Sequence, residues 1–340
     1  MDVRGISRID ALLGGDASCR PLVPDDSDAE AVGAVQDFLA CHGYKGMPGP
    51  LAGARGRFGP QTTNCVQQFQ RVCGLAPTGH VDRATLQMLI EREAQEAIAS
   101  HAYLQLVLRI PYEGLARVMS LTCLFEGAGR FAAINRNTDR AGLSYGLIQW
   151  AQKPGRLHEL LQGFSRQEPA AYVRIFGDGD AALANRLLAH TAKPRGGTDA
   201  RGVSVDPQFE LTDEPWLARF RRAACERALQ RVQVSMATAA FATSLAQIRK
   251  FAPQLSSERA IAFMLDLANQ HGDAGARSIF RAAQPATHRD EASLLLAVEH
   301  ESVRRVAEQF GAASREVVST RARRTAFRSS SLLSDNPFEH

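Results

Sequence analysis

Apolar residues recur at helical spacing in three stretches of the N-terminal third of the chain. The first stretch begins at Ser27, which forms a capping-box pattern with Glu30, and the second covers residues 60–72. The third begins at Asp82, a residue type that caps helix N-termini. Glycine follows the first two stretches, and a glycine in that place ends a helix readily. The pattern therefore predicts three short helices within residues 25–98.

A further apolar helical run ends in Glu126, and the two glycines within the next three residues terminate the helix. A polar loop follows and carries Asp139, and residues 142–150 predict a short hairpin that turns back into a helix. A carboxylic acid at the end of an apolar helix is partly desolvated, which favours its protonated form, whereas a carboxylate on a polar loop stays ionised. Cleavage of a glycosidic bond uses two carboxyl groups whose environments differ in this way.

Helical patterns continue over most of the chain after residue 113, so the sequence predicts a mainly α fold with one small β-hairpin. Amphipathic helices are expected at four places in this part: residues 157–164, residues 168–176, a stretch from residue 213, and residues 256–271. Asp266, Asn269 and His271 on the last of these are assigned to the helix surface, with approach to the catalytic cleft as the alternative. Near the C-terminus four arginines are expected to form a solvated face, with contact to a catalytic carboxylate or an anionic wall as the alternative: Arg321, Arg323, Arg324 and Arg328. Residues 329–340 are serine-rich and are predicted to be a disordered tail.

The composition is that of an ordinary globular protein with a mild basic excess. Of the 340 residues, 45% are hydrophobic and 22% are charged, and the net charge is +4. A chain of this length accommodates two domains. The positive excess favours an acidic polymer such as a bacterial cell wall as partner, and it is too weak to predict nucleic-acid binding.

The sequence shows neither a membrane span nor a standard signal peptide. No run approaches 18 apolar residues, and the first residues lack both a continuous apolar core and a convincing cleavage site. We therefore expect synthesis in the cytoplasm and export by a route other than a signal peptide.

Cysteine and histidine spacing predicts no metal site, and no cofactor is expected. Cys123 and Cys225 are interpreted as buried small hydrophobic residues. The other four cysteines precede residue 75, so a disulfide among them is possible if the protein works outside the cytoplasm. The sequence leaves that question open. The four are Cys19, Cys41, Cys65 and Cys73.

Two N-terminal motifs resemble the three-helix peptidoglycan-binding module of bacterial and phage wall hydrolases. They are GRFGPQT at residues 56–62 and CVQQFQ at residues 65–70, and TLQML follows at residues 85–89. The resemblance covers residues 25–98, which leaves residues 1–24 as an N-terminal arm. It implies that this part binds wall glycan or stem peptide without doing chemistry, with Phe58 and Gln61 as candidate contacts and core packing as the alternative for Phe58.

The central stretch resembles the active-site region of the lysozyme superfamily, with the chitosanase-like branch and phage endolysins as its nearest relatives. The segment LTCLFE ends at Glu126, and DRAGLSYGLIQW begins at Asp139. The resemblance implies that Glu126 is the general acid and that Asp139, with Ser144, activates a water. It also implies a catalytic domain over residues 112–328, in which Tyr145 and Gln149 line the sugar subsites. The structural alternatives are a loop-capping residue for Asp139, a core aromatic for Tyr145 and an ordinary turn residue for Ser144.

These resemblances together predict a muramidase that inverts, with carboxyl groups about 6.5–9.5 Å apart instead of about 5–5.5 Å. A lytic transglycosylase is the enzymatic alternative, because it needs only the glutamate. A non-catalytic wall-binding structural protein is the alternative of another class. The predicted partner is bacterial peptidoglycan, met in the periplasm or on the wall of a target bacterium. Release as a phage endolysin and delivery as an effector both fit, and the latter would involve a delivery apparatus and an immunity protein.

Overall fold

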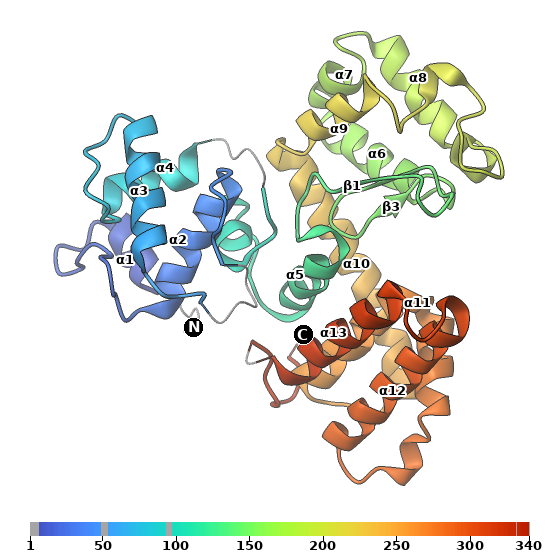
Figure 1. Ribbon diagram of the computed structural model, residues 1–340. Coiled ribbons are helices and arrows are strands. Elements are labelled where there is room, and N and C mark those ends of the chain that lie inside the picture. The colour runs from blue at the N-terminus through green and yellow to red at the C-terminus, as the bar shows by residue number, and fades with distance from the viewer. Residues whose placement is uncertain (1–6, 49–53, 93–96, 331, 340) are drawn as a thin grey trace. The chain divides into compact units, whose positions relative to one another are not determined.

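The computed structural model describes residues 7–48, 54–92, 97–330 and 332–339 (Figure 1). The chain forms two compact units, one made of Met1–Tyr112 with Glu126–Met236 and the other of Glu113–Phe125 with Ala237–His340. Two of the three divisions fall inside helices, α5 (Gly114–Gly127) and α10 (Arg227–Phe251), and the third lies just before α5. Helices dominate both units, as the sequence predicts.

Four helices form the N-terminal part of the first unit: α1 (Ser7–Gly14), α2 (Ala29–Cys41), α3 (Pro60–Val72) and α4 (Arg83–Glu91). Helix α2 packs on α1, α3 and α4. The three helices predicted within residues 25–98 are confirmed, and α1 adds a helix within the arm. Their shared core consists of apolar side chains at helical spacing, namely Val32, Val35, Phe38, Val66, Phe69, Leu86 and Leu89.

Side-chain caps fix the starts of two of these helices. Asp82 accepts a hydrogen bond from the Thr85 amide at 2.8 Å, which confirms it as the predicted N-cap of α4. Helix α2 begins one residue later than predicted, because Asp28 and not Ser27 accepts from the Ala31 amide, at 3.0 Å. A carboxylate at that position also interacts favourably with the positive end of the helix dipole.

A three-stranded antiparallel sheet follows α5, in the order β1 (Ile134–Arg136), β2 (Leu143–Tyr145) and β3 (Trp150–Ala151). Ser144 lies opposite both Asn135 and Ala151, in the middle strand. The hairpin predicted within residues 142–150 is therefore present, and β1 adds a third strand to it.

Four helices follow the sheet within the first unit: α6 (Arg156–Gln167), α7 (Pro169–Phe176), α8 (Ala181–Thr191) and α9 (Trp216–Ala223). Helix α6 contacts β2, β3, α7 and α8, and α7 contacts α9. Helices α6, α7 and α9 are predicted from the sequence, whereas α8 is not. Short helical turns complete the chain: η1 (Tyr103–Val107), η2 (Pro194–Gly197), η3 (Pro207–Phe209) and, in the second unit, η4 (Pro285–Thr287).

The second unit is built on three mutually packed helices, α11 (Glu258–Ala282), α12 (Glu291–Phe310) and α13 (Arg315–Ser329). The apolar face predicted for residues 256–271 is buried, with Ile261, Met264, Leu265 and Ala268 at most 6% exposed. Gly272 has a φ of 70° and interrupts α11 where the sequence predicts its end, but the chain resumes helical conformation beyond it.

The solvated face predicted for the arginines near the C-terminus is wrong for Arg323 and Arg324, which are buried. Arg323 and Arg324 are only 6% and 0% exposed, and both pair with Asp266, which is fully buried. Arg328 pairs with Glu299 at 2.9 Å. The assignment of Asp266 to a helix surface is therefore wrong as well. Opposite charges compensate each other's desolvation, which is why these groups tolerate burial.

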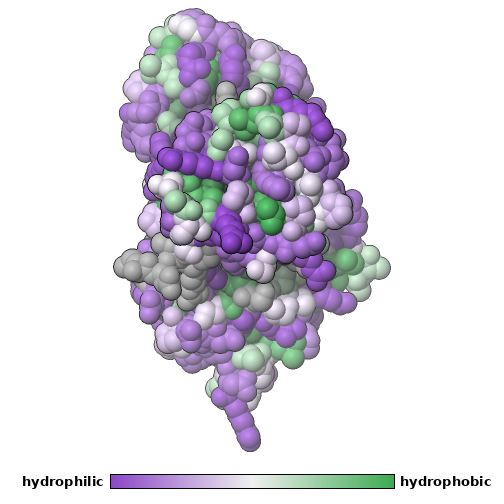
Figure 2. Space-filling model, turned by 90° about the vertical axis from the view of Figure 1, so that its left-hand side faces the viewer, coloured by the Kyte–Doolittle hydropathy of each residue, from purple (hydrophilic) through white to green (hydrophobic). Residues whose placement is uncertain are grey.

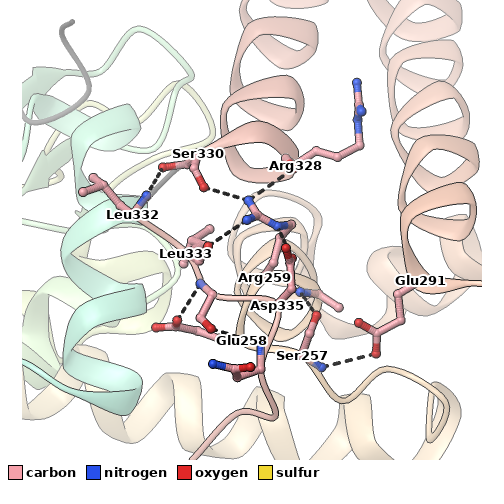
Figure 3. Close-up of polar contacts among 12 residues, drawn as sticks. Ser257, Glu258, Arg259, Glu291, Arg328, Ser330, Leu332, Leu333 and Asp335 are labelled. Carbon is pink, nitrogen blue, oxygen red and sulfur yellow. Dashed lines mark hydrogen bonds and ion pairs between the residues drawn. The ribbon is translucent and has the colours of Figure 1, made fainter.

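Residues 332–339 differ from the predicted disordered tail. Figure 3 shows this segment lying against the start of α11, where Glu258 accepts from the Ser334 amide at 2.8 Å and Arg259 donates to the Leu333 carbonyl at 2.7 Å. Leu333 is only 3% exposed. The segment is ordered because its backbone groups find partners on the helix. Residues 331 and 340 lie outside the described residues.

The face drawn in Figure 2 is mainly hydrophilic, and its hydrophobic residues form small separate areas. Among the described residues, no helix combines the length and apolar character needed to cross a membrane.

Candidate functional site

Glu126 lies in the last turn of α5 and is half-buried. The chain leaves the helix through two residues with left-handed backbone angles, Ala128 with a φ of 56° and Gly129 with a φ of 70°. The helix thus ends where the sequence predicts, directly after the carboxylate.

The end of α5 packs closely on the sheet. A Cβ atom added to Gly127 would lie 2.5 Å from the Ala133 Cβ and 3.8 Å from the Gln149 Nε2. Only glycine allows this approach. Gln149 in turn donates through Nε2 to the Gly146 carbonyl at 3.0 Å and to the Ala133 carbonyl at 3.4 Å. The structure therefore brings Gln149 next to the helix end that carries Glu126.

Asp139 lies on the exposed loop between β1 and β2, as predicted. Its carboxylate accepts from the Ala141 amide at 3.2 Å, which makes a local turn. Along the chain, Glu126 precedes β1 and Asp139 follows it.

Two predicted site residues lie inside the protein. Tyr145 is fully buried, stacks obliquely on Phe220 with ring centroids 4.9 Å apart, and donates its hydroxyl to the Phe220 carbonyl at 3.0 Å. Burial raises the pKa of Tyr145. The prediction that Tyr145 lines a sugar subsite is wrong, because packing on Phe220 places the ring in the core. Ser144, at 3% exposure, is likewise enclosed in the middle strand.

Gln233 on α10 is a buried residue that holds the hairpin by hydrogen bonds to its backbone, and the sequence did not predict this role. Its Oε1 accepts from the Leu147 amide at 3.0 Å, and its Nε2 donates to the Phe131 carbonyl at 3.2 Å. Gly146 makes room for it, since a Cβ there would lie 2.6 Å from the Gln233 Oε1. The available signal is a lone amide between two apolar neighbours, Val232 and Val234, on a helix.

Of the two residues predicted to contact the wall polymer in the N-terminal part, one is exposed and the other is buried. Gln61 is exposed at the start of α3. Phe58 is 1% exposed and belongs to the core, so its predicted contact with a ligand is wrong. Buried Gln36 positions this turn, since its Nε2 donates to the Arg57 carbonyl at 2.9 Å and its Oε1 accepts from the Gly56 amide at 3.0 Å.

No group of three or more His, Cys, Asp or Glu side chains in the described ranges is arranged to hold a metal ion. Among the described residues, no cysteine forms a disulfide. Cys123 is fully buried, whereas Cys225 is half-buried.

Residues 28–89 match the family described as "Putative peptidoglycan binding domain". The match covers α2, α3 and all but the last two residues of α4. Residues 28–89 therefore form a peptidoglycan-binding domain. The peptidoglycan-binding domain falls within residues 25–98, the range in which the sequence predicts such a module. The chain is also similar to a protein of Kitasatospora aureofaciens named "Uncharacterized protein in bpoA1 3'region", with 33% identity over 84 residues, or 25% of this chain and 68% of that protein.

Proposed function

We propose that the protein is a muramidase, a glycoside hydrolase that cleaves the glycan strands of bacterial peptidoglycan. The position of Glu126 carries the proposal: it is a half-buried carboxyl group at the end of an apolar helix, in a chain that also holds a peptidoglycan-binding domain. Glycan cleavage requires a proton donor at the glycosidic oxygen, and a carboxylic acid serves in that role.

In the proposed mechanism Glu126 protonates the glycosidic oxygen, and the Asp139 carboxylate accepts a proton from a water that attacks the opposite face of the sugar. Such a mechanism inverts the sugar configuration and requires the two carboxyl groups to lie about 6.5–9.5 Å apart. Ser144 is buried, so the water is assigned to Asp139 alone. Gln149 uses its Nε2 on backbone carbonyls, which leaves Oε1 as the atom to meet an amide of the sugar.

A lytic transglycosylase is the second candidate. The observation that favours it is the burial of Ser144 together with the exposure of Asp139, which gives an attacking water few fixed partners. A transglycosylase forms an anhydro sugar end and needs only the proton donor.

The proposal extends to where the enzyme acts and how it arrives. Its substrate is the wall of a target bacterium, reached either as a phage endolysin or as an effector carried by a delivery apparatus and countered by an immunity protein. The domain that matches the peptidoglycan-binding family supports the first part of this statement.

The test is digestion of purified peptidoglycan, with the soluble fragments identified by mass spectrometry. We expect fragments with reducing ends from the wild type and a loss of about 10²–10⁴-fold in the rate for Glu126→Gln. Asp139→Asn should cause a comparable loss in a hydrolase and spare a transglycosylase. Glu168→Gln, which changes an exposed glutamate after α6, is the matched control.

Three outcomes separate the candidates. Reducing ends made by the wild type and lost in Glu126→Gln support the muramidase. Anhydro ends replace it with the transglycosylase. Peptidoglycan that is bound but never cleaved by the wild type overturns both and leaves a wall-binding protein without catalytic activity.

A further inference from the structure

The loop that carries Asp139 is held by a second, distant loop of the same unit. We call residues 137–142 the Asp139 loop and residues 195–206 the clamp loop. The Asn137 Nδ2 donates to the Arg201 carbonyl at 2.9 Å, and the Asn137 Oδ1 accepts from the Gly142 amide at 2.9 Å. One side chain thus both closes the Asp139 loop and ties it to the clamp loop.

The two loops also meet backbone to backbone. A Cβ atom added to Gly202 would lie 2.1 Å from the Asn137 Oδ1, 2.7 Å from the Gly142 amide nitrogen and 2.8 Å from the Arg140 carbonyl carbon. Gly202 also has a φ of +80°, a conformation that other residues adopt at a cost. No larger residue fits at this contact without moving one of the loops.

The ammonium group of Lys153 joins the two loops by hydrogen bonds to backbone carbonyls. Its Nζ donates to the Ala200 carbonyl at 2.9 Å and to the Arg140 carbonyl at 3.3 Å, so the ammonium group lies between one carbonyl of each loop. The Lys153 amide donates to the Ala141 carbonyl at 2.9 Å. Arg140 and Ala141 directly follow Asp139, so these bonds act on the backbone that carries its carboxylate.

Gln152, the residue before Lys153, makes a second bridge between the two loops. It is 1% exposed, accepts from the Leu143 amide at 3.1 Å and donates to the Gly196 carbonyl at 3.1 Å. A Cβ on Gly196 would lie 1.9 Å from the Gln152 carbonyl oxygen, so this contact too depends on glycine. The bridge connects the base of the Asp139 loop to the base of the clamp loop.

The Asp139 loop needs such support because its backbone is strained. Asn137 and Arg140 have φ angles of 57° and 59°, in the left-handed region. Asparagine tolerates that region, whereas arginine adopts it at a cost of about 1 kcal/mol. An isolated loop would relax to other conformations, and contacts from outside select this one.

The clamp loop is itself rigid enough to serve as a support. Asp199 accepts from the amides of Arg201 at 2.7 Å and Val203 at 3.1 Å. At its base, Ser204 hydrogen-bonds to His190 of α8, which is 2% exposed, at 3.0 Å. The support therefore runs from the helical core of the unit to the Asp139 loop.

We propose that Lys153 is a positioning residue, which together with Gln152 and the clamp loop holds Asp139 where it can accept a proton from the attacking water. This rests on the role of Asp139 in the proposed function. Lys153 is not proposed to touch the substrate or the attacking water. It acts through the backbone carbonyls of Arg140 and Ala141, which directly follow Asp139.

The principal test variant is Lys153→Met, which removes the ammonium group and keeps the chain length. Turnover of soluble glycan fragments should fall about 10–100-fold, because small displacements of a catalytic group have effects of that size. The KM should stay within about twofold, since substrate contacts are unchanged. Amide exchange in residues 137–142 should accelerate, and Lys153→Arg, which keeps the donors, should restore both properties in part. Lys250→Met, an exposed lysine in the second unit, is the matched control.

Unchanged exchange and turnover in Lys153→Met would overturn the proposal, and so would faster exchange with normal turnover. A fall in turnover equal to that of Lys250→Met would also overturn it. If the wild type digests no peptidoglycan, the proposed function fails first, and the exchange of residues 137–142 still decides whether Lys153 holds the loop. A melting curve for each variant separates loss of positioning from loss of folding.

Discussion

Asp266 is fully buried, and two guanidinium groups surround its carboxylate. Arg323 donates to both oxygens, at 2.8 and 2.7 Å, and Arg324 lies 2.8 Å from one of them. Burial by itself favours the neutral acid, but the two cations outweigh it and hold the pKa of Asp266 below its usual range. Gln270 accepts from Arg324 at 2.6 Å and so satisfies part of the second cation.

Asp266→Asn should destabilise the protein by about 3–5 kcal/mol, because it leaves two buried guanidinium groups without their anion. Denaturant unfolding followed by circular dichroism measures the change. Glu308→Gln removes an exposed partner of Arg304 and should cost less than about 1 kcal/mol. Equal losses in the two variants would show that the buried pair contributes no more than a surface one.

His271 introduces a pH dependence near this cluster. Burial, together with the nearby cations Arg324, Arg305 and Arg323, lowers the pKa of His271 from 6.5 to about 4, while Asp266 acts in the opposite sense. The folded protein therefore keeps His271 neutral where the unfolded chain takes up a proton. The free energy of unfolding must therefore fall as the pH falls from about 6.5 to about 4. Above about pH 6.5 both states hold His271 neutral, and none of this stability is lost.

The measurement is the melting temperature at several pH values between 7 and 4. His271→Gln should lose a few degrees less than the wild type across this window, since roughly 1 kcal/mol corresponds to about 2–4 °C in a chain of this size. Parallel curves for the two proteins would contradict the assignment of the pH dependence to His271.

Among the elements, α11 shows how a helix start is completed by a remote segment. The amides of Glu258 and Arg259 donate to the carbonyls of Asn336 at 2.9 Å and Ser334 at 3.0 Å. Ser257 caps the helix and accepts from the Ala260 amide at 3.1 Å. The first amides of a helix lack partners within it, and here the C-terminal segment supplies two of them.

Arg259 is the residue that fastens this segment, as Figure 3 shows. Its guanidinium donates to the carbonyls of Ser330 at 2.8 Å and Leu333 at 2.7 Å, and to the Asp335 carboxylate at 2.6 Å. Arg259→Ala should lower the free energy of unfolding by about 2–3 kcal/mol and accelerate amide exchange in residues 332–339. Arg289→Ala, at an exposed position, should stay within about 0.5 kcal/mol of the wild type. Protection of residues 332–339 that survives in Arg259→Ala would disprove the role.

At the scale of the whole molecule, the chain joins a peptidoglycan-binding domain to the site around Glu126. Gln61 is the exposed predicted contact of that domain, at the start of α3. A Cβ on Gly46 would lie 2.1 Å from the Gln61 Nε2, so the amide lies close to the backbone of a neighbouring loop. An exposed amide is suited to bind the hydroxyl and amide groups of wall polymers.

Gln61→Ala should weaken sedimentation with insoluble peptidoglycan about 3–10-fold, the loss expected for one or two hydrogen bonds, and leave the melting temperature unchanged. Gln68→Ala changes an exposed amide on the same helix and should bind like the wild type. Glu126→Gln should also bind normally, because the proposed function assigns binding and cleavage to different parts of the chain. Loss of binding in Gln68→Ala and not in Gln61→Ala would move the ligand site along α3.

Local sequence determines much of this protein. Helical periodicity and capping residues predict α2, α3 and α4, and the apolar run before Glu126 predicts a helix that ends at a carboxylate. These features depend on residues a few positions apart, and their physics is the same in any surroundings. The Asp139 loop and the hairpin after it are predictable for the same reason.

Tertiary structure alone decides which side chains are buried and what they meet. Tyr145 and Phe58 look like ligand contacts in sequence and are core residues in the fold. Arg324 pairs with Asp266, a residue 58 positions earlier by number, and Lys153 meets Ala200 across 47 positions. Such pairs depend on how helices and loops pack, and no local pattern encodes that packing. For this reason the sequence predicts where the carboxylates Glu126 and Asp139 lie along the chain, whereas the clamp that holds one of them emerges only from the fold.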